Sequence, residues 1–287
     1  MRELWTGCSS WTSPAWNGRF YPRGIPDGDR LAFYARYFDT VEVDSTYYAA
    51  PNSFVVRGWA RKTPERFRFS LKMPRHLLDP KRPVEEGALA EFVENAQLLG
   101  GKLGPIVMQF APWFRAPRST GVGNAAQLDR LLRALPGRAQ YAVELRDAGW
   151  FRPEMAAWLT DRLVEEKVAL VWSSLTFLEV PPIRTTDWAY LRFIGDHETV
   201  PAGQHGELRV DRTAETRRWA SRLKEAEVES AFAYFNNHFA GYGPASANIF
   251  QVEMGLPALK LPSEEASPGA PDRLQRRLPV DDPPGPL

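Results

Sequence analysis

Charged and polar side chains alternate with apolar ones near the ends of several short apolar runs. In Val41-Glu42-Val43-Asp44 the acids alternate with valines, and in Ser70-Leu71-Lys72 a leucine separates two polar residues. Because successive side chains of a β-strand point to opposite faces, the polar residues of each run share one face. The same parity holds in later runs, at Gln109, Glu144, Arg146, Arg192 and Asn236. Burying so many polar groups is costly unless they pair with one another or serve a ligand.

These residue types are suited to acid/base chemistry. Two carboxylates in different environments, Glu42 and Glu144, can hold different pKa values and act as acid and base. Lys72 and Arg192 would bind an anionic group or stabilise a developing oxyanion. A lysine beside another cation could also lose its proton and form a Schiff base. We therefore predict that Glu42, Lys72 and Glu144 form one coupled catalytic site.

Further candidates would bind the substrate around these three. They are Asp44, Tyr47, Gln109, Arg146, Trp150, Arg192, Asn236 and Asn237. Aromatic residues that follow the apolar runs could form a rim that stacks on sugars or bases. These are Trp11, Trp16, Phe20, Tyr21, Tyr47, Tyr48, Trp113, Phe114, Trp150, Phe151, Phe239 and Tyr242. The alternative is a structural network, in which Glu42–Lys72 and Glu144–Arg192 are simply buried ion pairs.

The elements that must position these residues are strands alternating with helices. Strand-like runs occur at 4–9, 40–45, 67–73, 105–110, 140–146, 168–173, 188–195 and 231–236. Helix-period segments occur at 30–37, 54–62, 89–99, 125–135, 153–166, 214–227 and 245–253. The sixth gap offers only residues 175–179, which we interpret as a short turn of helix. Such alternation predicts a parallel sheet, and its eight units favour an α/β (β/α)8 TIM barrel over a doubly wound open sheet with an appended piece.

The domain organisation follows from length and composition. The 287 residues fit one barrel domain over residues 1–261. Residues 262–287 are rich in Pro, Gly, Ser and charge without apolar periodicity, which predicts a disordered tail. Helix signals agree with the assigned segments: Asn52 or Ser53 can cap the second helix, Gly100-Gly101 can end the third, and Pro153 can begin the fifth.

Composition restricts the function classes. The 36 Lys+Arg nearly balance 35 Asp+Glu, whereas proteins that bind nucleic acid by neutralising phosphates usually have a basic excess. Cys8 is the only cysteine, so we expect no internal disulfide and a reducing compartment. We see no signal peptide and no apolar stretch long enough to span a bilayer, which predicts a cytoplasmic protein that does not enter membranes. The sequence does not decide the oligomeric state.

Metal and cofactor chemistry has little support in the sequence. The four histidines, His76, His197, His205 and His238, are scattered and lack metal-ligand spacing. We predict no cofactor and no tightly bound metal, although a weak site at Glu42, Asp44 and Glu144 stays open.

Several motifs resemble the YecE-like family of unknown function. They are Trp5-Thr6-Gly7-Cys8-Ser9-Ser10-Trp11, Tyr34 to Tyr48, Phe69 to Pro74, Gln109-Phe110-Ala111-Pro112, Val143-Glu144-Leu145-Arg146 with Trp150-Phe151, Tyr190-Leu191-Arg192 and Tyr234-Phe235-Asn236-Asn237. The match covers about residues 4–261, with the motifs in order at strand ends. The resemblance implies a TIM barrel similar to the xylose isomerase and apurinic-endonuclease type, with no established activity.

The sequence departs from the family at three places. The family usually has Asn where Asp44 stands, His where Asp147 stands, and His-Gly where Ile194-Gly195 stands. These departures count against a histidine acid or base at the last two positions. The zinc-dependent nucleases of this barrel type use a dense set of His and carboxylate ligands that this chain lacks, so their mechanism is not carried over.

The sequence is consistent with two functions. The first is a metal-independent hydrolase or isomerase that acts on a small polar substrate, sugar-containing or phosphorylated. The second, less favoured, is a nucleic-acid-binding protein that uses an aromatic and arginine-lined barrel mouth.

Overall fold

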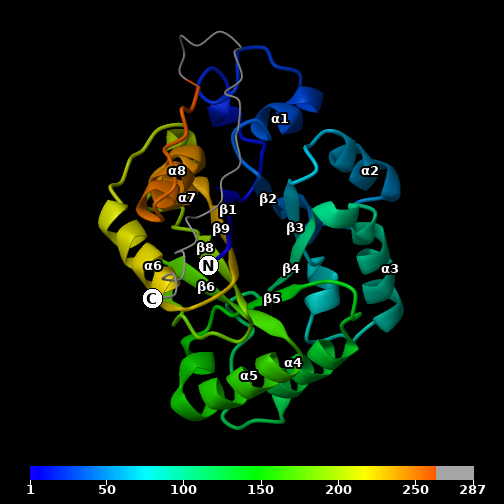
Figure 1. The fold of residues 1–287 in the computed structure, drawn as a ribbon. Helices are drawn as coiled ribbons and strands as arrows, with labels where there is room; N and C mark the ends of the chain where they lie inside the picture. The colour runs from blue at the N-terminus through cyan, green and yellow to red at the C-terminus, as the bar shows by residue number, and fades with distance from the viewer. Residues whose placement is uncertain (263–287) are drawn as a thin grey trace, which may run out of the picture.

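The computed structural model describes residues 1–262, in which eight parallel strands close into a barrel (Figure 1). The strands are β1 (Glu3–Cys8), β2 (Thr40–Val43), β3 (Arg68–Lys72), β4 (Leu103–Gln109), β5 (Tyr141–Glu144), β6 (Val168–Leu175), β8 (Trp188–Phe193) and β9 (Ser230–Phe235). Each strand pairs in parallel with the next, β6 with β8, and β9 pairs back with β1. The predicted TIM barrel is therefore confirmed. The predicted tail lies, apart from Pro262, outside the described residues.

Helices surround the ring of strands (Figure 1). They are α1 (Asp27–Tyr34), α2 (Ser53–Arg61), α3 (Glu86–Gln97), α4 (Gly123–Ala134), α5 (Pro153–Glu165), α6 (Thr213–Glu225), α7 (Asn237–Ala240) and α8 (Gly243–Glu253). Local signals set several boundaries. Asn52 caps α2 by accepting a hydrogen bond from the Val55 amide at 3.0 Å. Pro153 occupies the first turn of α5, and Gly100, with φ +58°, follows α3.

The connection after β6 differs from the expected turn of helix at 175–179. The chain instead forms a hairpin in which β7 (Leu178–Glu179) pairs antiparallel with the end of β6, Leu175 opposite Leu178. The helix prediction was wrong because β6 continues as a strand through Leu175, and a two-residue turn then allows immediate antiparallel pairing. No α-helix lies between β6 and β8 within the described residues.

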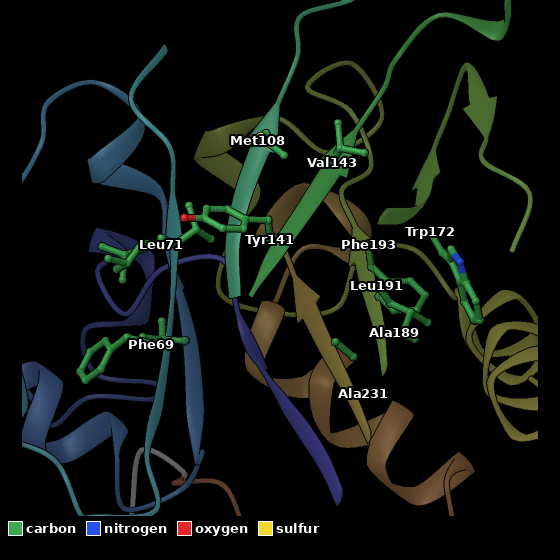
Figure 2. Packing of buried hydrophobic residues seen from close by; sticks show 14 of the residues in the cluster. Phe69, Leu71, Met108, Tyr141, Val143, Trp172, Ala189, Leu191, Phe193 and Ala231 are labelled. Atoms are coloured by element: carbon green, nitrogen blue, oxygen red, sulfur yellow. The ribbon is translucent and has the colours of Figure 1, made fainter. Parts of the chain in front are cut away.

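The apolar core has two layers, one on each side of the barrel wall. The outer face packs against the helices and includes Leu71, Val143 and Leu191 (Figure 2). The interior contains a smaller apolar cluster with aromatic residues such as Tyr190 and Tyr234. The predicted alternation is therefore observed, and the polar residues of the opposite parity are directed toward the barrel axis.

The barrel interior is also hydrogen-bonded below the mouth. The Tyr190 hydroxyl lies 2.6 Å from Ser70 Oγ, and the Tyr234 hydroxyl lies 2.7 Å from Thr40 Oγ1. All four residues are fully buried. These pairs satisfy buried hydroxyls that would otherwise lose their hydrogen bonds to water.

Candidate functional site

An arginine at the end of β8 is the centre of the candidate site. The Arg192 guanidinium donates through Nε (3.2 Å) and Nη2 (2.8 Å) to Glu42 Oε1. Its Nη1 donates to Glu144 Oε2 and, at 2.8 Å, to Gln109 Oε1. Arg192 is 1% exposed, and both glutamates are 0% exposed. The pair Glu144–Arg192 that the sequence suggested is thus formed, with Glu42 as its second carboxylate.

Both glutamates have additional donors. Glu42 Oε2 accepts from the Tyr190 hydroxyl at 2.6 Å. Glu144 Oε1 accepts from Ser173 Oγ at 2.8 Å, and Arg146 Nη2 lies 3.1 Å from Glu144 Oε2. A buried carboxylate with hydrogen bonds on each oxygen is held in its ionised form.

The electrostatics agree with that geometry. Burial alone would raise the pKa of Glu144, but the guanidiniums of Arg146 and Arg192 and the Ser173 hydroxyl lower it to about 2. Burial likewise opposes ionisation of Glu42, and Arg192 with Lys72 lowers its pKa below the ordinary value. In turn the two glutamates raise the pKa of Arg192 against the effect of its burial. The three groups are therefore charged together.

Lys72 and Asp44 form the second half of the network. Lys72 Nζ lies 2.7 Å from Asp44 Oδ1 and donates to Gln109 Oε1 at 2.8 Å. The sequence suggested Glu42–Lys72 as one buried ion pair. In the structure Lys72 instead pairs with Asp44, two residues further along the chain. The Gln109 oxygen joins the two halves because it accepts from both Lys72 and Arg192.

Asp44 differs from the two glutamates in access and in electrostatics. Its side chain is 32% exposed, whereas those of Glu42 and Glu144 are inaccessible. Partial burial raises the pKa of Asp44, the Lys72 ammonium opposes that effect, and the nearby Glu42 carboxylate reinforces it. Asp44 is thus the carboxyl group of this network that combines partial exposure with a raised pKa.

Two further candidates lie at the margin of the network. The Lys72 ammonium lies 5.8 Å from the centre of the Tyr47 ring, within cation–π range. Burial raises the pKa of Tyr47, and the guanidiniums of Arg146 and Arg75 oppose this. Arg146 Nε is buried without a hydrogen-bond partner. The structure therefore brings together Glu42, Asp44, Tyr47, Lys72, Gln109, Glu144, Arg146 and Arg192.

Three sequence candidates lie elsewhere in the structure. Trp150 is fully buried, donates to the Phe114 carbonyl at 2.9 Å, and stacks on the Phe114 ring. Asn236 caps α7, where its Oδ1 accepts from the His238 amide at 3.0 Å. Asn237 Oδ1 accepts from Trp16 Nε1 and the Gly243 amide. Their polar atoms stabilise local structure. Helix capping and loop closure use the same residue types as ligand binding, so the sequence alone does not separate these uses.

Two members of the network were missed as site residues. Ser173 and Tyr190 hydrogen-bond to Glu144 and Glu42, respectively. Strand parity could have found both, since Ser173 follows the interior residue Val171 by two positions and Tyr190 precedes Arg192 by two. A hydroxyl within an apolar strand is a weak signal by itself.

The expected aromatic rim is largely part of the core. Trp16, Phe20, Tyr21, Phe114, Trp150 and Phe239 are buried. Tyr48 and Trp113, by contrast, are 70% and 61% exposed. Of the expected rim, Trp113 and Tyr48 are therefore the members most available to a ligand.

The histidines are less scattered than the sequence suggested. The rings of His197 and His238 have centres 3.8 Å apart, and His205 Nε2 lies 3.2 Å from His238 Nδ1. Burial and histidine neighbours lower the pKa of both His205 and His238. Within residues 1–262, no group of three or more His, Cys, Asp and Glu side chains is arranged to hold a metal ion. The absence of a tightly bound metal stays a prediction. No helix in the described part is long and apolar enough to cross a membrane.

The fold and this site define a class: a TIM-barrel protein with a buried charged network at the carboxyl ends of its strands. Residues 5–271 match the sequence profile of the protein family of unknown function DUF72. The chain therefore belongs to the DUF72 family, which confirms the resemblance drawn from the motifs.

Two bacterial relatives share part of the sequence. The chain is 29% identical over 149 residues to the UPF0759 protein YecE of Escherichia coli K12 and 26% identical over 157 residues to the UPF0759 protein YunF of Bacillus subtilis. These matches cover 52% of this chain and 50% and 53% of the relatives, so the similarity spans about half their length.

Solved DUF72 structures share the fold. A protein from Thermotoga maritima aligns with a TM-score of 0.73 at 24% identity, covering 88% of this chain and 99% of that one. A protein from Enterococcus faecalis aligns with a TM-score of 0.71 at 22% identity, covering 95% and 100%. At these identities the likeness shows the fold alone.

Proposed function

We propose that this protein is an enzyme that carries out acid/base chemistry on a small polar substrate, sugar-containing or phosphorylated, as a hydrolase or isomerase. The observation that supports the proposal best is the contrast among its carboxylates. Glu42 and Glu144 are buried and fixed on Arg192, whereas Asp44 lies at the accessible edge with a raised pKa. Perturbed groups at the end of a barrel strand are typical of active sites.

The proposal assigns proton transfer to Asp44 in place of the two glutamates. A general acid or base must reach the substrate and exchange a proton near the working pH. The contacts of Glu42 and Glu144 do not favour that role, because each is inaccessible and has a lowered pKa. Their role in this mechanism is to orient Arg192 and keep its charge in place.

Lys72 would act as an electrostatic group. Its ammonium, held between Asp44 and Gln109, can stabilise negative charge that develops on a substrate oxygen as Asp44 takes a proton. Because Lys72 Nζ is engaged by both Asp44 and Gln109, the geometry favours this role over a Schiff base.

A deuterium-incorporation assay tests the proposal. Pentose and hexose phosphates and glycosides are incubated in D2O with the protein, and NMR follows exchange of carbon-bound protons and release of products. We expect Asp44→Asn to lower kcat by about 100-fold or more with little change in KM, the scale of a lost general acid or base. Asp29→Asn, on the exposed surface of α1, is the matched control and should retain full activity.

A different outcome would favour the nucleic-acid-binding alternative. If the panel shows no turnover and single-stranded nucleic acid binds with a steep negative slope of log affinity against log salt, the enzyme proposal is wrong. Turnover that survives Asp44→Asn unchanged would also contradict it.

A further inference from the structure

The positive charges of the network are already matched by acids. Its cations are Lys72, Arg146 and Arg192, and its carboxylates are Glu42, Asp44 and Glu144. Each cation lies within ion-pair distance of at least one of these carboxylates. An anionic group of a substrate would therefore meet no surplus positive charge at the barrel axis.

A pocket of about 420 Å³ adjoins the network and has such a surplus. Its lining includes Tyr47, Arg75, His76, Arg82, Gln109 and Trp113. It lies where the loops after β3 and β4 meet, and these strands are neighbours in the barrel. Its volume is within the range of small-molecule sites and well above that of a bare inorganic ion.

The two pocket arginines are only partly neutralised. Arg82 Nε lies 3.8 Å from Asp79 Oδ2, and Asp79 also lines the pocket. The Arg75 guanidinium lies 5.8 Å from the centre of the Tyr48 ring, a contact that orients the planar group and leaves its charge uncancelled. Two arginines against one aspartate leave net positive charge before His76 is considered.

Gln109 connects the pocket with the network. Its oxygen is held at 2.8 Å by both Lys72 and Arg192, so its amide nitrogen is the part of the side chain that a ligand in the pocket would meet. Trp113, which is 61% exposed, offers a flat apolar surface on the pocket wall.

We propose that this pocket binds the phosphate monoester of the substrate on Arg75 and Arg82, with a sugar or aromatic ring against Trp113. A phosphate monoester carries about 1.5 to 2 negative charges at neutral pH and three acceptor oxygens. Two guanidiniums therefore bind it better than they would bind a carboxylate ligand, which has one charge and two oxygens. Bound in this way, the ligand directs its far end past Gln109 toward Asp44. This assignment rests on the proposed enzymatic function, because it names the ligand as the substrate. Binding of a phosphate monoester to the pocket can nevertheless be measured without turnover.

Calorimetric titration at low ionic strength tests the pocket with three probes: inorganic phosphate, phenyl phosphate and benzoate. Phenyl phosphate should bind at least tenfold more tightly than benzoate, which has the ring and one negative charge. Arg75→Gln and Arg82→Gln should each weaken phenyl phosphate at least fivefold. Trp113→Ala should weaken phenyl phosphate and leave inorganic phosphate unchanged. Arg57→Gln, an exposed arginine of α2 outside the pocket, is the control and should change nothing.

The outcomes separate this inference from the proposed function. Unchanged binding in Arg75→Gln and Arg82→Gln, or equal affinity for benzoate and phenyl phosphate, overturns the phosphate pocket whatever the catalytic result. Asp44→Asn should still bind phenyl phosphate within twofold of the wild type. If that variant binds normally and also turns over normally, the acid/base proposal fails while the pocket stands. Both arginines are exposed, and melting temperatures equal to the wild type confirm that the variants are folded.

Discussion

Arg192 shows how one buried side chain can determine the arrangement of several others. It contacts carboxylates from β2 and β5 and the amide of Gln109 from β4, so it links four strands at one level of the barrel. A charge in this position is tolerated because each nitrogen of the guanidinium donates to a carboxylate or amide oxygen. Removing the arginine would leave Glu42 and Glu144 buried without the cation that they share.

We therefore expect Arg192→Met to lower the free energy of unfolding by about 3–5 kcal/mol, the scale observed when one partner of a buried pair is removed. Urea unfolding measures the change. Arg57→Met, on the exposed face of α2, is the control and should change stability by less than about 0.5 kcal/mol. A small effect in Arg192→Met would mean that the glutamates take up protons or water at little cost, which the hydrogen bonds of the network argue against.

At the scale of elements, the strand ends deliver the charged groups and the loops beyond them provide access. Asp44 begins a 3-10 helix directly after β2, whereas Glu42 lies within the strand two residues earlier. After that change of backbone direction the Asp44 side chain is partly exposed, whereas that of Glu42 is enclosed. The loop after β8 is tied down differently, through close packing of Gly195 against the start of α7.

Gly195 offers a test of that packing. Its φ is +67°, and an added Cβ would lie 2.0 Å from the His238 carbonyl oxygen, a backbone atom that cannot move alone. We expect Gly195→Ala to cost more than about 3 kcal/mol. Gly24, with φ +77° and nothing within 4 Å of an added Cβ, isolates the conformational cost. Gly24→Ala should cost only about 1–2 kcal/mol. Equal losses in thermal or urea unfolding would show that the loop after β8 yields to the methyl group.

Over the whole molecule, stability is linked to pH through the buried network. The pKa of Glu144 is lowered to about 2 from an ordinary value of 4.5, and that of Glu42 is lowered as well. A lowered pKa in the folded state stabilises the protein fully above the ordinary pKa, and this stabilisation is lost as pH falls toward the folded value. Asp44 acts in the opposite direction, since its pKa is raised.

Two carboxyl groups with a lowered pKa, Glu42 and Glu144, outweigh one with a raised pKa, Asp44. We therefore expect the free energy of unfolding to fall steeply as pH decreases from about 4.5 to about 2. Chemical unfolding at a series of pH values measures this slope. Glu144→Gln removes one of the titrating groups. The free energy of unfolding of this variant should be lower than that of the wild type at neutral pH and should depend less steeply on pH over the same interval. Parallel slopes in the two proteins would mean that groups outside the network dominate acid unfolding.

Much of the architecture could be predicted from the sequence because strand parity and helix period are local signals. The barrel and the interior position of Glu42, Lys72 and Glu144 followed from alternation alone. The partners could not be predicted: Lys72 paired with Asp44, and Arg192 became the centre, since cross-barrel distances depend on closure and stagger of the sheet. For Trp150, Asn236 and Asn237 the sequence could not show the packing and capping contacts, because packing, capping and ligand binding draw on the same residue types.

The hydroxyl pairs beneath the network, Ser70–Tyr190 and Thr40–Tyr234, bear on how this scaffold could diversify. They fill the barrel interior with hydroxyls that hydrogen-bond to one another. Loss of one hydroxyl would take a hydrogen bond from its buried partner, so a substitution at one of these residues requires a compensating substitution at another. Arg75, Arg82 and Trp113, in the loops after β3 and β4, are by contrast exposed. Directed evolution toward new ligands should therefore find its tolerated changes at these exposed positions, and libraries that keep the buried Leu77, Leu78 and Phe114 of the same loops would preserve folding while sampling recognition.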